Sequence, residues 1–447
     1  MGEEEFKLAE KYKKGDGVKR DLTKAFESFL KSAEKGNVRG MFEVGLCYSR
    51  GRGVAEDKAK AFEWYLKSAE NGNASGMNST GAFYEKGIGV AQDKAKAFEW
   101  YFRSAEKGNA NAMYKVGFCF HSGFGVAQDK TKAFKWYLKS AQKGNDIAMR
   151  NVGICYENGE GVIEDKAKAF EWFLKSAQTG DIDALNNVGE CYFKGNGVQQ
   201  DLKTALELFL KAANRGNNNA MNNIGICYEK GMGVSQDKTL AFEWFLKSAQ
   251  NGNDDAMYHV GSYYKNGDGV TRDCQKAFEW YLKAAEKGNT DAMLAVALCF
   301  ETGFGVTQDK EKAFEWYNKG GEKGNVDAIK STALCYEKGI GTAQDYSHAF
   351  EWYLKAAEKG NLEAMNTIGL YFSKGNGVKQ DKSKACVWFL KAANGGYVQA
   401  MNALGSCYEN GEGVPQDKNK AIGWYKKAES YGSVDAHQRI CALISKT

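Results

Sequence analysis

Hydrophobic positions along this chain follow a pattern of two alternating short helices. Between residues 38 and 50, and again between 58 and 71, apolar side chains recur at the i, i+3, i+4, i+7 spacing that places them on one helix face. Val44 and Tyr48 belong to the first stripe and Tyr65 to the second. Each stripe needs another apolar surface to cover it. The pattern therefore predicts a pair of packed helices, here called helix A and helix B.

Capping residues mark where these two helices begin and end. Asn37 and Asp57 precede the stripes, and their side-chain oxygens can accept from the amides that a first helical turn leaves unpaired. Gly51 and Gly72 follow the stripes, and glycine readily adopts the positive φ that closes a helix. Gly53 lets the chain turn back sharply. The short connector between the helices makes them antiparallel, so the unit is predicted to be an αα-hairpin.

The far side of helix B is predicted to face water. Glu63 precedes Lys67 by four residues, and nine units keep an acidic residue before a basic one at this spacing. Such pairs support a helix by about 0.2–0.5 kcal/mol each. Trp64 is predicted to lie in the buried stripe, where the large aromatic side chains fill the space between hairpins.

The hairpin is repeated with a period of 36 residues and without one insertion or deletion. The aspartate that caps helix B recurs twelve times, and all ten tryptophans share one position in the unit. A single hairpin is too small to bury a core, so we expect the units to stack. The predicted fold is all-α, an α/α superhelical solenoid of twelve 36-residue helix-turn-helix repeats plus a C-terminal capping helix. One domain is expected over 3–447, with repeats at about 3–36, 37–72, 73–108, 109–144, 145–180, 181–216, 217–252, 253–288, 289–324, 325–360, 361–396 and 397–432.

The final helix is predicted at 434–446 and is expected to cover the end of the stack. Arg439 and Lys446 would then face water. Removing this helix should expose the aromatic layer around Trp424.

Charge and composition exclude several classes of partner. The 447 residues include 61 basic and 56 acidic side chains, mixed along the length, so a nucleic-acid partner is not expected. No stretch approaches the roughly 18 apolar residues of a membrane span. The first residues are too charged for a secretory signal, and a cytoplasmic location is expected.

The cysteines, histidines and glycine-rich turns do not form a recognisable site of chemistry. Eight of the eleven cysteines, Cys47 among them, share one position in helix A. Successive units should hold them about 8–10 Å apart, beyond disulfide reach, so we interpret them as small buried side chains in a reducing compartment. Disulfides in the unreduced protein would contradict this. The four histidines lie in different repeats, and the Gly-x-Gly turns lack the further residues of a phosphate-binding loop, so neither a metal nor a cofactor is predicted.

The unit resembles the Sel-1-like repeat, a relative of the tetratricopeptide repeat, over essentially the whole of 3–447. The resemblance implies a right-handed α/α superhelix that acts as an adaptor or scaffold in protein complexes and has no enzymatic activity. It also implies that the A helices line a concave surface. The motif is read in one unit from Ala112, Gly117, Gly123, Gly125, Val126, Asp129, Lys132, Ala133, Phe134, Trp136, Tyr137, Lys139, Ala141 and Gly144.

Binding residues are expected at positions of helix A that vary between units while remaining exposed, because residues that recur are explained by folding. We predict that a groove along the A helices binds an extended peptide or a partner helix. Side-chain amides would pair with the peptide backbone, and aromatic and arginine side chains would supply hot spots. The predicted anchors are Tyr114, Phe118, Arg150, Asn186, Asn187, Asn222, Asn223 and Tyr258.

Two other functions remain open at this point. The chain could be an architectural spacer within a longer signalling or quality-control protein, and capture of a partner from the cognate cell extract would separate this from an adaptor. It could also be a cell-wall or small-molecule hydrolase module. That role requires a nucleophile, a base and an orienting group in one unit, and no unit that departs from the consensus supplies all three. The oligomeric state and the identity of the partner are not determined by the sequence.

Overall fold

The computed structural model describes residues 1–444, and within this range it contains 25 α-helices and no strands. The alternation of A and B helices is as predicted, and the all-α fold of paired helices is confirmed. The A helices are α1 (Glu3–Lys14), α3 (Val38–Arg50), α5 (Ala74–Lys86), α7 (Ala110–Ser122), α9 (Asp146–Asn158), α11 (Ile182–Lys194), α13 (Asn218–Lys230), α15 (Asp254–Asn266), α17 (Thr290–Thr302), α19 (Val326–Lys338), α21 (Leu362–Lys374), α23 (Val398–Asn410) and α25 (Val434–Ile444). The B helices are α2 (Leu22–Glu34), α4 (Lys58–Glu70), α6 (Lys94–Glu106), α8 (Lys130–Gln142), α10 (Lys166–Thr179), α12 (Leu202–Asn214), α14 (Lys238–Gln250), α16 (Cys274–Lys287), α18 (Lys310–Glu322), α20 (Tyr346–Glu358), α22 (Lys382–Asn394) and α24 (Lys418–Ser430).

The helix ends form through the local contacts that the sequence indicates. Asp57 accepts a 3.0 Å hydrogen bond from the backbone amide of Lys60, and this bond lowers the pKa of the Asp57 carboxyl. Asn37 caps its helix A in the same way. Gly51 ends that helix with a φ of 62°. Tyr397 stands where other units have a polar cap, and its side chain makes no capping bond.

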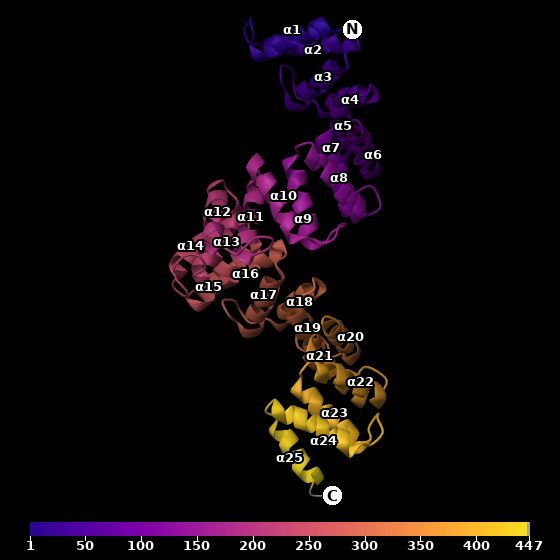
Figure 1. The fold of residues 1–447 in the computed structure, drawn as a ribbon, viewed down its shortest axis with the longest axis vertical. Coiled ribbons are helices and arrows are strands. Elements are labelled where there is room, and N and C mark those ends of the chain that lie inside the picture. The colour runs from indigo at the N-terminus through magenta and orange to yellow at the C-terminus, as the bar shows by residue number, and fades with distance from the viewer. Residues whose placement is uncertain (445–447) are drawn as a thin grey trace. The chain divides into compact units, whose positions relative to one another are not determined.

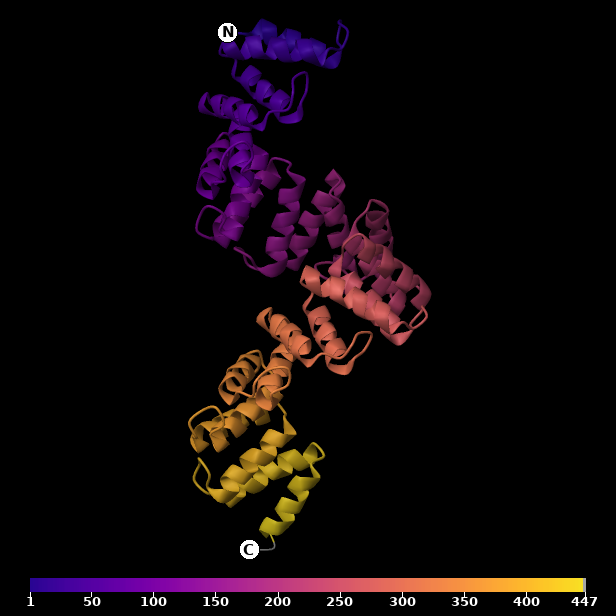
Figure 2. The ribbon, with the colours of Figure 1, turned by 180° about the vertical axis from the view of Figure 1, so that it is seen from behind.

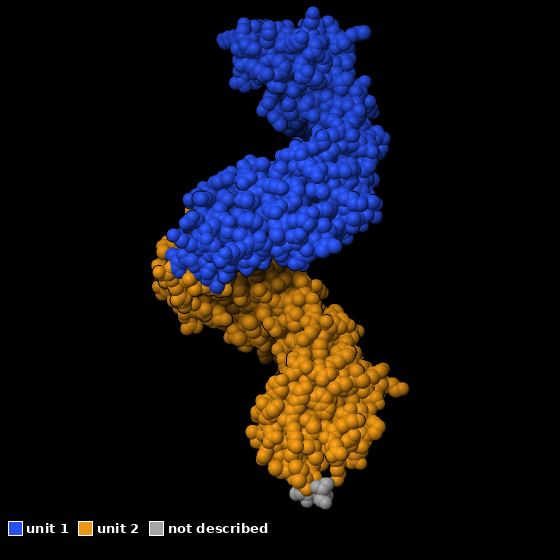
Figure 3. Space-filling view, viewed as in Figure 1, with its two compact units in different colours: residues 1–220, 232–234 blue, residues 221–231, 235–447 orange. Residues whose placement is uncertain are grey.

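The chain divides into two compact units, shown in blue and orange in Figure 3. Unit 1 comprises Met1–Ala220 and Met232–Val234, and unit 2 comprises Met221–Gly231 and Ser235–Thr447. Inside each unit, successive helices pack against each other, as α7, α8 and α9 do in unit 1 and α21, α22 and α23 do in unit 2 (Figures 1 and 2). The single domain over 3–447 stays a prediction. None of the helices within 1–444 is long and apolar enough to cross a membrane.

The interior of each hairpin is built from small side chains beside aromatic ones. Ala61 is fully buried and lies next to the buried Tyr65 in α4, while α3 contributes Val44 and Cys47. Cys47 and the seven cysteines at equivalent positions are all buried, as predicted. Burial raises the pKa of the Cys47 thiol to about 11, so this thiol is neutral at pH 7.

The cations of helix B lie over tryptophan rings rather than beside the predicted glutamates. Trp64 is half-buried, and Lys67 Nζ lies 4.5 Å from its ring centroid. Each of the ten tryptophans is followed, three residues later, by a Lys or Arg whose Nζ or Cζ atom lies 4.0–5.0 Å from the centroid of the tryptophan ring. Of the predicted i,i+4 pairs, the described residues form only the one between Arg103 and Glu99. Glu63 and Lys67 are exposed, so this face meets water as predicted. The predicted pairing was largely wrong, because the half-buried ring face attracts the cation and its apolar stem.

From the second repeat onwards, the second glycine of the Gly-x-Gly turn contacts the preceding repeat. A Cβ atom on Gly125 would lie 2.0 Å from the backbone oxygen of Lys94, the first residue of α6. Gly17 has the same φ of 70°, yet nothing lies within 4 Å of its Cβ position, since no repeat precedes it. This glycine therefore permits close packing between repeats as well as a sharp turn.

The final helix packs onto the last hairpin. Ile440 and Leu443 of α25 are buried in the same apolar cluster as residues of α23 and α24. Arg439 is exposed, as predicted. The predicted end of this helix at 446, together with Lys446, lies outside the described residues.

Candidate functional site

Two of the predicted anchors in unit 1 form an aromatic surface on α7. Tyr114 and Phe118 are four residues apart and therefore share a helix face. Tyr114 is half-buried, with its ring centroid 5.9 Å from that of Tyr137 in α8. Phe118 leaves 37% of its surface exposed. The structure thus brings this pair together with one ring open to solvent.

Arg150 is held in an ion pair within the protein. Its Nε lies 2.9 Å from Asp181 Oδ2 and its Nη2 lies 3.2 Å from Asp183 Oδ2. Asp181 caps the N-terminus of α11, where most units have asparagine. The guanidinium therefore fastens α9 to the start of the next A helix, and its predicted role towards a partner stays a prediction.

The asparagine anchors are less accessible than the sequence indicated. Asn186 in unit 1 and Asn222 in unit 2 are only 3% and 8% exposed, so the expectation that both are exposed was wrong. The Asn186 amide donates a 2.9 Å hydrogen bond to Glu190 Oε1, one turn later in α11. Their neighbours Asn187 and Asn223 are half-buried.

The burial has a common cause, because the face of helix A that carries these residues is directed towards the start of the next A helix. Lys330 Nζ, at the equivalent position of α19, lies 2.9 Å from Glu363 in α21. Asn402 of α23 donates a 2.9 Å hydrogen bond to Ser433 Oγ, just before α25. Arg150, Lys330 and Asn402 therefore serve packing between repeats, although the residue at this position varies.

Four asparagines at this same position keep a buried carbonyl oxygen without a hydrogen-bond partner. They are Asn78, Asn222, Asn366 and Asn402. A buried unpaired acceptor costs about 1–3 kcal/mol. The oxygens are shielded from solvent, so an incoming peptide could pair with them only after the side chains rotate. Exposed positions of helix A are the better candidates for contact with a partner.

Exposed leucines recur on three successive A helices of unit 2. Leu298 in α17, Leu334 in α19 and Leu370 in α21 occupy equivalent positions and are 42%, 37% and 39% exposed. They are not among the anchors predicted from the sequence. The sequence did contain a signal for them, because these three repeats have leucine at a position where two other repeats have serine, Ser262 and Ser406. We refer to the three side chains as the leucine row.

A cavity of about 290 Å³ opens beside the first member of the leucine row. Tyr258, the last predicted anchor, lines it together with Leu294, Leu298 and Phe304. The Tyr258 ring centroid lies 5.6 Å from that of Tyr281, another lining residue. Lys265 and Asp291 also line the cavity. Unit 2 thus combines a predicted aromatic anchor with a largely apolar cavity that could accept a side chain.

Next to Tyr258, His259 is stacked on an aromatic ring. Its imidazole centroid lies 4.5 Å from that of Phe245, with an angle of 16° between the rings. Burial lowers the pKa of His259, while the nearby carboxylates of Glu229 and Asp255 act in the opposite direction. The neutral imidazole is therefore the favoured form in the folded protein.

We expect His259 to make unit 2 less stable in mild acid. The unfolded chain has the ordinary histidine pKa of 6.5 and the folded chain a lower one, so below about pH 6.5 the unfolded state binds more protons and stability falls. The variant His259→Asn carries the residue that the neighbouring repeat has at the equivalent position, Asn223. Between pH 7 and pH 5, this variant should lose less stability than the wild type. Urea denaturation at the two pH values measures this difference. An equal loss in both proteins would contradict the assignment.

Among residues 1–444, no group of three or more His, Cys, Asp or Glu side chains is arranged to hold a metal ion. The observed features are packed hairpins, an exposed leucine row and cavities between repeats. Such an arrangement can hold side chains of a partner.

Comparison with known proteins identifies the repeat. A family model described as Sel1 repeat matches twelve consecutive segments, at 5–37, 38–73, 74–109, 110–145, 146–181, 182–217, 218–253, 254–289, 290–325, 327–361, 362–397 and 398–430. The chain is similar to the crystal structure of a protective antigen of uropathogenic Escherichia coli strains that displays an SLR fold, with 32% identity, a TM-score of 0.55, and coverage of 94% of this chain and 91% of that one. It is also similar to a Sel1 repeat protein from Oxalobacter formigenes, with 28% identity, a TM-score of 0.52, and coverage of 55% of this chain and 96% of that one. No curated protein sequence matches the chain.

Proposed function

This chain belongs to the Sel1 repeat family, and from that premise we propose that it is a non-enzymatic scaffold that binds a protein or peptide partner along the exposed faces of its A helices. Proteins built from such repeats typically act as protein-interaction scaffolds. The residues that recur in every unit form the hairpins and the contacts between them. Recognition of a partner is therefore assigned to the side chains that vary and remain accessible.

The leucine row is the observation that carries this proposal. Leu298, Leu334 and Leu370 repeat at one position, so their spacing follows the stacking of the A helices, about 8–10 Å per packed helix. Single exposed apolar residues are common on protein surfaces, but a regular series beside an apolar cavity is typical of an interaction site. An amphipathic helix or an extended segment with apolar residues at matching intervals would cover the row.

The aromatic anchors extend the same proposal. Tyr258 lines the cavity beside the row in unit 2, and Phe118 supplies an exposed ring on α7 in unit 1. Aromatic residues are enriched among those that dominate binding energy in interfaces. Asn187 and Asn223 keep their proposed role as adaptable polar contacts.

A cytoplasmic location remains part of the proposal. Its support is the series of buried free cysteines at one position of helix A, which fills space in the hairpin as small apolar side chains do.

To test the proposal, each leucine of the row is replaced by serine, which two other repeats have at this position. Leu298→Ser, Leu334→Ser and Leu370→Ser are combined in one variant, because Ser262 and Ser406 occupy the equivalent positions. Immobilised wild type and variant are incubated with extract of the source cell, and each captured partner is then titrated against both proteins. We expect the variant to bind the partner at least tenfold more weakly and to keep its helical circular dichroism spectrum.

A matched control changes exposed apolar residues on a B helix. Val387 and Leu390 of α22 are 53% and 40% exposed. Most other repeats have glutamate at the position of Val387, and one repeat has asparagine, Asn318, at the position of Leu390. The combined Val387→Glu and Leu390→Asn variant should bind the partner as the wild type does. If this control weakens binding and the serine variant does not, the A-helix surface is the wrong assignment.

A further inference from the structure

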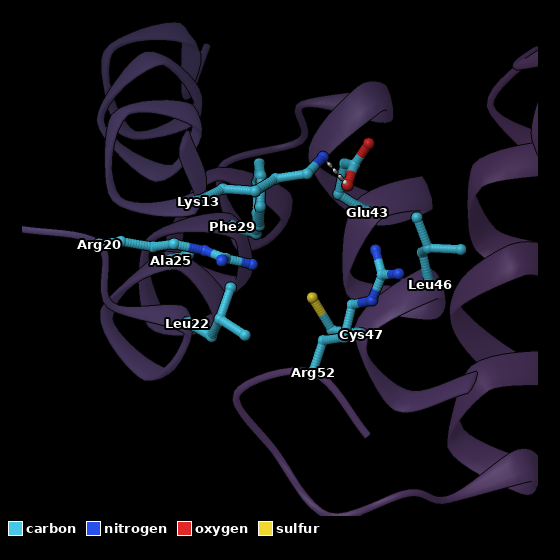
Figure 4. A pocket seen from close by; sticks show the side chains of 9 residues that line it. All are labelled: Lys13, Arg20, Leu22, Ala25, Phe29, Glu43, Leu46, Cys47 and Arg52. Atoms are coloured by element: carbon cyan, nitrogen blue, oxygen red, sulfur yellow. Dashed lines mark hydrogen bonds and ion pairs between the residues drawn. The ribbon is translucent and has the colours of Figure 1, made fainter. Parts of the chain in front are cut away.

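A small cavity of about 170 Å³ lies between the first and second repeats of unit 1 (Figure 4). Apolar side chains, including Leu22, Phe29 and Leu46, form part of its lining. Arg20 and Arg52 also line it, and each comes from a loop that follows a helix A. Figure 4 shows the Arg20 side chain extending towards the centre of the cavity, and the Arg52 side chain rising from its loop to lie beside Cys47 and Leu46.

The charges in this cavity are not balanced. Lys13 Nζ lies 2.9 Å from a carboxylate oxygen of Glu43, so these two lining residues neutralise each other. Arg20 and Arg52 have no carboxylate within 4.0 Å among the described residues. The Cys47 thiol between them is neutral at pH 7, because burial raises its pKa to about 11. The lining therefore carries two positive charges without a partner.

The cavity beside the leucine row, in unit 2, is built at the same positions of the repeat. Leu46 and Cys47 correspond to Leu298 and Cys299, which are seven repeats further along the chain and line the second cavity. The two cavities are therefore equivalent spaces between one hairpin and the next. Their differences show which residues set the chemistry.

Lys13 of the first cavity has its equivalent, Lys265, in the second, whereas two other positions of the lining differ in charge. The middle residue of the Gly-x-Gly turn is Arg52 in the first cavity and Phe304 in the second. The helix A residue is Glu43 in the first and Ala295 in the second. The second cavity is consequently apolar at both positions, whereas the first presents a guanidinium group.

Arg20 adds the second unpaired charge by departing from the consensus. Eight units have a glutamine at this position, and its side-chain amide closes the loop, as Gln128 Nε2 does by donating a 2.6 Å hydrogen bond to the backbone oxygen of His121. Arg20 lines the cavity instead. The exchange therefore replaces a side chain that bonds to its own loop with one that lines the cavity.

We propose that the cavity of the first two repeats binds a carboxylate on a short aliphatic stem, the side chain of an Asp or Glu in an acidic segment of the partner. This inference rests on the proposed function and specifies the chemistry of one contact. Guanidinium groups bind carboxylates through planar, often bidentate, hydrogen bonds, and two of them compensate the charge that the ligand loses to solvent. Leu22, Phe29 and Leu46 would contact the methylene groups of the stem.

A titration with small probes tests the cavity without the partner. N-acetyl-glutamate N-methylamide is added to the full-length protein, and the arginine Nε–Hε signals are followed by NMR. We expect saturable shifts of the Arg20 and Arg52 signals that weaken as salt rises. The uncharged N-acetyl-glutamine N-methylamide should cause no saturable shift. Inorganic phosphate is titrated in parallel, and tighter binding of phosphate than of the glutamate probe would overturn the assignment to a carboxylate.

The variants use residues that the repeat already tolerates at these positions. Arg52→Phe copies Phe304, and Arg20→Gln copies the consensus. Each should raise the dissociation constant of the glutamate probe at least tenfold, measured through the remaining arginine signal. Phe304→Leu, in the equivalent cavity, should leave it unchanged. Equal binding of the glutamate and glutamine probes, or unchanged binding by both arginine variants, would overturn the proposal. Failure of the leucine-row experiment would not alter this titration, so the two proposals fail separately.

Discussion

Replacing Gly125 by alanine should destabilise unit 1 by about 2–5 kcal/mol. Two effects add. An alanine at the φ of 70° found here costs about 1–2 kcal/mol, because its Cβ atom crowds the backbone in the left-handed region. In addition, that Cβ atom would lie 2.0 Å from the backbone oxygen of Lys94, which is fixed in the first turn of α6 and cannot rotate away. Hydrogen exchange of α6 and α7 measures the local loss.

The chain contains its own control for this substitution. Gly17 has the same φ of 70° but nothing within 4 Å of its Cβ position. Gly17→Ala should therefore cost only the backbone term, about 1–2 kcal/mol. The difference between the two variants isolates the contact between repeats. Equal costs would show that the repeats separate easily at this point and that the close approach contributes little to stability.

Deleting residues 434–447 should release the last hairpin from its packed state. The deletion removes the buried side chains of Ile440 and Leu443 and uncovers Leu404 and Tyr425, which are 2% and 1% exposed in the intact protein. Losing the burial of two large aliphatic side chains alone costs on the order of 3–6 kcal/mol. Because each repeat contacts only its neighbours, the loss should be concentrated in α23 and α24. Hydrogen exchange should rise there and fall off towards earlier repeats.

The control for the deletion is Gln438→Ala on the exposed face of α25. It retains the apolar contacts and should leave exchange in α23 and α24 unchanged. If the deletion also left exchange and solubility unchanged, the final helix would not protect the core of the last hairpin.

The binding surface was only partly predictable from the sequence. Variation between repeats directed the prediction of anchors to helix A, and Phe118 is exposed as expected. Variation alone did not distinguish a side chain that meets solvent from one that meets the next repeat. Arg150 is paired with Asp181 of the next repeat, and Asn186 is buried. Leu298 was a better candidate, because a large apolar residue remains exposed there.

The sequence by itself determined the repeat, its period and the ends of its helices, because these depend on local features. An aspartate such as Asp57 caps a helix through an amide three residues away, and Gly51 ends one through its own backbone freedom. Only the tertiary structure decided what lies between repeats. Gly125 approaches Lys94 of the preceding repeat, and Arg20 and Arg52 of successive repeats line one cavity. The geometry in both places depends on how one hairpin stacks on the next.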